Sequence, residues 1–217
     1  MSAELLALLW DSFLETLVMV GLAGGIAAAI GIPLGLVLTV TAPGHILSRP
    51  RFNRGLGLLV NAVRSTPFII LMVAIIPLTR LLTGTSIGTA AAVVPLTLAA
   101  IPFVGRLVEA SLREVDAGLI EAAQAMGATP LQIVAKVLIP ESLPGIINGL
   151  TIMLVSLIGF SAMAGAVGGG GLGDLGIRYG YQRFMPEVMV MVVLVLIVFV
   201  QIVQSLGDRL SRFLDHR

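Results

Sequence analysis

Residues 116–145 read DAGLIEAAQAMGATPLQIVAKVLIPESLPG, and this stretch predicts two short helices joined by a turn. The first helix has an apolar stripe at i, i+3, i+4 and i+7. The stripe consists of Leu119, Ala122, Ala123 and Met126. Gly127 suits the end of this helix, because glycine adopts the left-handed conformation common there. Thr129 is a favourable N-cap for the second helix, with Pro130 at its first position and Gln132 completing a capping box.

The chain on both sides of this hairpin is too apolar for a water-soluble domain. Of its 217 residues, 57% are hydrophobic and 12% are charged, and the mean hydropathy is +1.05. Soluble domains average roughly 45–50% apolar and about 25% charged residues. A helix that crosses the hydrocarbon core needs about 20 mostly apolar residues. Five segments meet that length, at residues 13–40, 57–79, 86–105, 143–167 and 186–207.

These segments predict an all-α membrane protein with five transmembrane helices. The hairpin, at residues 116–140, lies between the third and fourth spans, and we expect Pro140 to interrupt or end its second helix. Pairs of glycines four residues apart, such as Gly21/Gly25 and Gly31/Gly35, favour close packing between transmembrane helices. The glycine-rich segment after the fourth span is expected to be a flexible loop, which meets a partner or caps the bundle.

The distribution of basic residues predicts the orientation of the bundle. One side receives nine of the thirteen lysines and arginines, namely Arg49, Arg51, Arg54, Arg106, Arg113, Lys136, Arg209, Arg212 and Arg217. The other side receives Arg80, Arg178 and Arg183, and Arg64 falls within the second span. Because cytoplasmic loops carry the excess of positive charge, we expect the hairpin and the C-terminus in the cytoplasm and the N-terminus outside. The first ten residues lack the basic region of a signal peptide, so no cleavage is expected.

Composition also limits the chemistry of this chain. It contains no cysteine and only two histidines, His45 and His216, so no metal site is expected. A P-loop requires a lysine followed by serine or threonine, but the single lysine, Lys136, is followed by Val137. We therefore expect no ATP hydrolysis and no cofactor in this chain. The net charge of +1 does not favour nucleic-acid binding.

At the hairpin the sequence resembles a known family. Residues 121–123 (EAA), Gly127 and the Ile139-Pro140 pair are similar to the EAA signature of ABC-importer permeases, with Ile-Pro here in place of Leu-Pro. Four further segments resemble the methionine-uptake (MetI-like) permeases, and the resemblance extends from about residue 12 to 207. They are RSTPFII at 64–70, GTSIG at 84–88, GFSAMAG at 159–165 and GGGGLGD at 168–174.

The resemblance implies a type I ABC importer fold in the bacterial inner membrane. Family members pair as homodimers around one translocation pathway, on two cytosolic MetN-like ATPase subunits that bind ATP and magnesium. A MetQ-like binding protein delivers methionine, as the L- and also the D-isomer, on the outer side. The resemblance divides the chain into an N-terminal segment (1–12), a permease domain (13–207) and a cytoplasmic tail (208–217). It assigns the ATPase contact to Leu119, Glu121, Ala122, Ala123, Met126, Gly127, Ala128 and Thr129.

Candidate pathway residues lie in the second and fourth spans. They are Arg64, Ser65, Phe160, Ser161 and Met163. Charges within the membrane are candidates for function by default, although an arginine this close to a span end can also snorkel to the interface as an anchor. Ser161 and Met163 suit either helix packing or a pathway for a small apolar amino acid. These alternatives remain open on the sequence.

Three other functions compete with methionine import. A permease for another small amino acid would share all of these features. A secondary transporter is less consistent, because the chain shows no internal repeat and no buried acidic pair. An intramembrane serine hydrolase based on Ser161 would need a general base, and no histidine or lysine lies in any predicted span.

Overall fold

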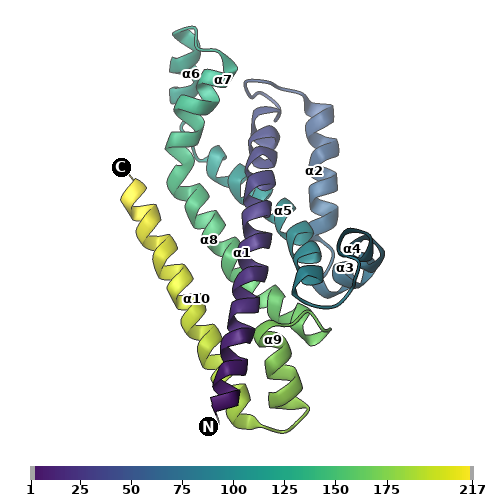
Figure 1. The fold of residues 1–217 in the computed structure, drawn as a ribbon. Helices are drawn as coiled ribbons and strands as arrows, with labels where there is room; N and C mark the ends of the chain where they lie inside the picture. Colours follow the sequence, from purple (N-terminus) through teal and green to yellow (C-terminus); the bar gives the residue numbers. More distant parts are fainter. Residues whose placement is uncertain (1–2, 216–217) are drawn as a thin grey trace.

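The computed structural model describes residues 3–215, and every regular element in this range is helical (Figure 1). The elements are α1 (Ala3–Val40), α2 (Pro50–Arg64), α3 (Phe68–Ala74), α4 (Ile76–Thr83), α5 (Thr89–Arg113), α6 (Ala117–Ala125), α7 (Pro130–Ile133), a π-helical turn (Val134–Leu138), α8 (Ile139–Ala166), α9 (Gly171–Leu175), a second π-helical turn (Gly176–Tyr181) and α10 (Pro186–Leu214). Helices α6 and α7 project at one end of the molecule, called here the hairpin end, and α9 lies toward the other.

Close packing of α1 on α5 forms the centre of the bundle. A Cβ atom on Gly31 would lie 2.6 Å from Cβ of Val104, and one on Gly35 would lie 2.7 Å from the carbonyl oxygen of Gly105. The predicted use of small residues for helix contact is therefore confirmed at this pair. At Gly21 and Gly25 a Cβ would meet nothing within 4 Å, so the same prediction is wrong there.

The predicted second span, residues 57–79, is divided among α2, α3 and α4. Helix α2 begins earlier, at Pro50, and meets α3 at an angle of 98°. Pro67 explains the break, because proline disfavours the helical conformation at the residue before it. The hydroxyl groups of Ser65 and Thr66 donate to the carbonyl oxygens of Asn61 and Ala62, which stabilises the end of α2. Four described helices can span a membrane by length and composition, or five when α2 and α3 count as one broken span.

The fourth span extends far beyond its predicted start at residue 143. Residues 130–166 form one helix from the hairpin through the span, and the prediction that Pro140 interrupts or ends it is wrong. The π-helical turn at Val134–Leu138 lies directly before Pro140. This turn changes the hydrogen-bond register where the proline ring would clash with the preceding turn of an α-helix. The second helix of the hairpin thus continues into α8 without an intervening loop.

The glycine-rich segment after α8 is folded back on the bundle, so the prediction of a flexible loop is wrong. Gly170 and Gly171 have φ of +82° and +74°, a conformation that favours glycine. The backbone N–H of Gly171 donates to Oε2 of Glu15 over 2.6 Å, and that of Leu172 donates to Oγ1 of Thr16 over 2.9 Å. Two side chains of α1 therefore cap the first turn of α9.

Candidate functional site

Helix α6 is defined at both ends by local interactions. The Asp116 carboxylate accepts a hydrogen bond from the backbone N–H of Gly118, which caps the N-terminus. Gly127 has φ of +77°, and the N–H of Ala128 donates to the carbonyl oxygen of Ala123. This geometry is the glycine-containing C-terminal motif that the sequence predicts.

The second helix of the hairpin begins with the predicted capping box. The hydroxyl group of Thr129 accepts from the backbone N–H of Gln132, and the Gln132 side chain accepts in return from the N–H of Thr129. Pro130 occupies the first helical position, where its missing N–H costs no hydrogen bond. Reciprocal capping fixes the turn between α6 and α7.

The apolar stripe of α6 is divided between the core and the surface. Ala123 is buried and joins Ile133 in the main hydrophobic cluster. Leu119, Ala122 and Met126 are exposed, and Met126 is 82% exposed. We call the exposed residues of this face the hairpin surface. It comprises Leu119, Glu121, Ala122, Met126, Gly127 and Thr129, with Ala128 half-buried behind them. Small and apolar residues are thus exposed on a capped, projecting hairpin.

An ionic cluster joins the hairpin end of α5 to α2. Glu109 accepts hydrogen bonds from Arg106 and Arg113, each over 2.6 Å, and its side chain is 5% exposed. Arg106 also donates to the carbonyl oxygen of Gly57 and to Oδ1 of Asn61, each over 3.0 Å. The residues that lead into α6 are therefore tied to the first half of the broken span.

A cavity of about 220 Å³ lies beside the break between α2 and α3, and we call it the break cavity. Its lining comes from α2, α3, α5 and α8 and the segment between α2 and α3. The lining residues are Val63, Arg64, Thr66, Phe68, Leu71, Ala99, Phe103, Ser156 and Phe160. The rings of Phe68 and Phe160 stack with centroids 4.8 Å apart, and the Arg64 guanidinium lies 5.9 Å from the centre of the Phe103 ring. The cavity thus combines one cation, two hydroxyl groups and aromatic surface.

The structure brings only some of the predicted pathway residues together. Arg64 and Phe160 both line the break cavity, and both Arg64 and the adjacent Ser65 are exposed in this chain. Ser161 is 1% exposed and donates to the carbonyl oxygen of Ile158, so it faces the core. Met163 is 49% exposed and does not line this cavity. Sequence reasoning did not find Phe68 or Ser156, because neither contact follows from spacing along one helix.

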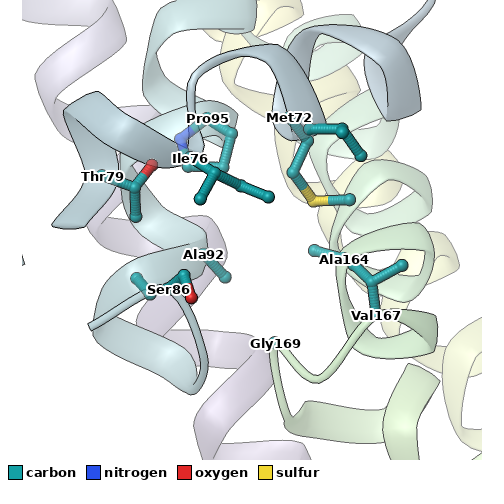
Figure 2. A pocket seen from close by; sticks show the side chains of 11 residues that line it. Met72, Ile76, Thr79, Ser86, Ala92, Pro95, Ala164, Val167 and Gly169 are labelled. Atoms are coloured by element: carbon teal, nitrogen blue, oxygen red, sulfur yellow. The ribbon is translucent and has the colours of Figure 1, made fainter.

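A second, smaller cavity of about 80 Å³ lies between α3, α4, α5 and the glycine-rich turn. Met72 and Ile76 extend toward it from one side, opposite Ala164 and Val167 (Figure 2). The backbone N–H of Gly88 donates to the carbonyl oxygen of Gly168, which links the start of α5 to this turn. The cavity is mostly apolar, and the helices on one side of it, α3 and α4, are only 7 and 8 residues long.

His45 lies in the connection between α1 and α2, at the hairpin end. Its Nδ1 atom is buried and has no hydrogen-bond partner among the described residues. Burial, with a smaller effect from the positive charge of Arg113, lowers the pKa of His45 below its usual 6.5. The ring is therefore neutral at pH 7.

Comparison with known proteins identifies the fold and the family. A family model described as "Binding-protein-dependent transport system inner membrane component" matches residues 31–217. The chain belongs to this family. Membership and the helical architecture together confirm the predicted fold, an all-α permease of the type I importer class with a projecting hairpin.

Relatives in this family are similar over most of the chain. The "Probable D-methionine transport system permease protein MetI" of Vibrio cholerae is 59% identical and covers 94% of this chain and 90% of its own length. The "D-methionine transport system permease protein MetI" of Escherichia coli K12 is 52% identical, covering 76% of each chain. A solved structure, "Inward facing conformations of the MetNI methionine ABC transporter", matches with a TM-score of 0.98 at 49% identity, covering 100% of both chains. The resemblance to methionine-uptake permeases is thus confirmed.

Proposed function

We propose that this chain is the membrane-spanning permease subunit of an ATP-driven importer of methionine. The observation that carries the proposal is the exposed hairpin surface on a bundle of this family. Relatives at 50% identity and above carry the name of D-methionine permeases. A capped, projecting hairpin with an exposed methionine suits coupling to a separate protein better than a role in packing within the bundle.

The proposed assembly has two copies of this chain, two MetN-like ATPase subunits and a MetQ-like methionine-binding protein. The chain is not an enzyme by itself. ATP and magnesium bind the ATPase subunits, which is consistent with the absence of a P-loop from the sequence. The hairpin end faces the cytoplasm and the N-terminus faces outward in the bacterial inner membrane, as the excess of basic residues at the hairpin side favours.

Coupling in this proposal runs through the hairpin surface, including Glu121, Ala122, Met126 and Gly127. ATP binding brings the two ATPase subunits together and moves the hairpins that are docked on them. Because residues 130–166 form one helix, that movement reaches α8 directly. The ionic cluster around Glu109 carries it to α2 through Arg106. The bundle then alternates between inward and outward access to one pathway.

The pathway in this proposal passes the break cavity. Arg64 and Phe160 line it, and Ser65 lies at its edge. Burial of Ser161 supports a role in helix packing that keeps Phe160 in place. Met163, exposed on the same helix, is proposed to meet the pathway once a second copy is present.

Reconstitution tests the proposal. Uptake of labelled L-methionine is measured in proteoliposomes that contain this chain, its ATPase and the binding protein, with each component omitted in turn. Uptake that requires ATP and all three proteins supports the proposal. Uptake that survives removal of the ATPase would indicate a secondary transporter instead. ATP hydrolysis without methionine uptake would retain the coupling role and point to another small amino acid.

A further inference from the structure

The break cavity holds an arginine without an anionic partner. Arg64 makes no ion pair or hydrogen bond among the described residues, and its guanidinium lies 5.9 Å from the centre of the Phe103 ring. None of the residues that line the cavity is acidic. Arg64 is exposed in this chain, where an anion from outside can reach it, and an arginine within a membrane-spanning segment is a candidate for binding a charged ligand. Arg64 is therefore suited to bind an anion that enters from outside the chain.

Two hydroxyl groups in the same cavity are available as acceptors. Ser156 donates its hydrogen to the carbonyl oxygen of Ile152 over 2.9 Å, and Thr66 donates to that of Ala62 over 3.2 Å. A hydroxyl group has one hydrogen to donate and two lone pairs that accept. With these hydrogen bonds in place, both oxygens offer lone pairs to a ligand, which suits them to an ammonium group.

The remaining walls are apolar and include three aromatic rings, from Phe68, Phe103 and Phe160. Thioether sulfur makes favourable contacts with the edges of aromatic rings. A volume of about 220 Å³ is below the roughly 300–1,000 Å³ typical of sites for drug-sized ligands, so the cavity suits a small amino acid.

We infer that the break cavity is an intramembrane binding station for a zwitterionic, apolar α-amino acid. Arg64 binds its carboxylate, Thr66 and Ser156 accept from its ammonium group, and the three phenylalanines surround its side chain. This inference rests on the proposed import function and adds which groups of the cavity bind each end of the substrate. The cavity lies beside the break between α2 and α3, with Arg64 and Phe68 on its walls from the two sides of the break.

Photocrosslinking tests the station directly. The probe is photo-methionine, in which a diazirine replaces the thioether, and it is applied to the permease–ATPase complex in lipid nanodiscs. Attached label is mapped to peptides by mass spectrometry. We expect label on peptides that contain Phe68, Phe103 or Phe160, and we expect unlabelled L-methionine to compete. Label confined to other peptides would overturn the inference.

Variants give the second readout. Arg64→Gln is expected to lower the yield of label at the cavity, and to raise KM for methionine uptake, by about tenfold or more, because a charge-assisted hydrogen bond is lost. Arg64→Lys keeps the charge, so its label yield and its KM should both lie between those of wild type and Arg64→Gln. Ser156→Ala should lower the yield of label by a few-fold. Arg54→Gln, an exposed arginine on the same helix, is the matched control and should change neither.

The outcomes separate the station from the import function. A wild-type complex that takes up no methionine would refute the proposed function. A wild-type complex that imports methionine, with label and KM insensitive to Arg64→Gln and Ser156→Ala, would overturn only the station. If Arg64→Gln does not assemble, then Ser156→Ala and the position of the label in the wild-type complex decide the question.

Discussion

Arg106 donates a hydrogen bond to Glu109 over 2.6 Å, one turn along α5, where the carboxylate is 5% exposed. The same arginine reaches the carbonyl oxygen of Gly57 on α2. One buried acidic group therefore fixes the arginine that joins the third span to the broken second span. In a bundle where most helix contacts are apolar, this is a directional link beside the hairpin.

Replacing the buried carboxylate tests this link. Glu109→Gln leaves the positive charge of Arg106 without its partner, and we expect the complex to lose about 3 kcal/mol of stability, typical for a broken buried pair. Thermal unfolding in detergent measures the change. The control is Asp174→Asn, which removes a more exposed pair with Arg178 and should cost less than about 1 kcal/mol. Equal effects of the two substitutions would contradict the structural role of the cluster.

The contact between α1 and α9 predicts a local effect. Glu15→Gln weakens the cap on Gly171, and the expected loss is about 1 kcal/mol, as for other N-caps. Hydrogen exchange should accelerate in residues 171–181 and stay unchanged in the hairpin. Asp11→Asn, one turn earlier on α1, is the control, since Asp11 is exposed like Glu15 but it is Glu15 that accepts the hydrogen bond from Gly171. If residues 171–181 exchange as slowly in the Glu15 variant as in wild type, the cap does not hold α9.

The exposed methionine of the hairpin surface predicts a binding defect without a folding defect. Met126→Glu places a charge on a side chain that is 82% exposed, so the melting temperature should change by little. Copurification with the ATPase subunit should fall by about tenfold or more if Met126 lies in the apolar centre of that contact. Phe213→Glu, at a similarly exposed site on α10, is the control. Normal copurification of the Met126 variant would exclude this residue from the contact.

Gly127 gives a complementary test in the backbone. Its φ of +77° disfavours side chains, so Gly127→Leu should cost about 1–2 kcal/mol locally and reshape the turn before Ala128. We expect ATP hydrolysis to continue while methionine uptake falls, because the reshaped turn would no longer pass the movement of the ATPase to a bundle that is itself unaffected. The ratio of uptake to hydrolysis is the measurement. An unchanged ratio would count against coupling through this hairpin.

His45 predicts a dependence of stability on pH. Its pKa is lowered in the folded chain, so between that pKa and 6.5 the unfolded state binds more protons than the folded state. Stability contributed by neutral His45 is therefore full above pH 6.5 and decreases as the pH falls through this window. The melting temperature of wild type should drop between pH 7.5 and 5.5, and His45→Asn should reduce the drop. Identical profiles would show that His45 does not contribute.

Local sequence signals predicted the hairpin in detail. The capping box at Thr129 and the turn at Gly127 depend on residues within a few positions of one another, and both have the predicted geometry. The close contact at Gly31 and Gly35 was predictable as a pattern, but its partner on α5 was not. The glycine pair at Gly21 and Gly25 has the same pattern without the contact, because spacing does not say which face meets a neighbour.

Features that depend on distant residues could not be read from the sequence. The caps from Glu15 and Thr16 join residues 156 positions apart, and hydropathy alone places Glu15 at a span end. The break cavity likewise needs Arg64, Phe103 and Phe160 from three helices. Pro140 was misleading for a different reason, since the π-helical turn before it allows the helix to continue.

The continuity of residues 130–166 has a mechanical consequence. At 1.5 Å per residue, these 37 residues make a rod about 55 Å long, with the hairpin surface at one tip. Tilting such a rod by about 5° around its far end moves the hairpin by about 5 Å, roughly one helical turn. The displacement decreases along the helix from the hairpin surface toward the end about which it tilts. In the proposed coupling, a movement of the hairpin surface would therefore become a smaller displacement beside the break cavity, which lies nearer the other end of this helix.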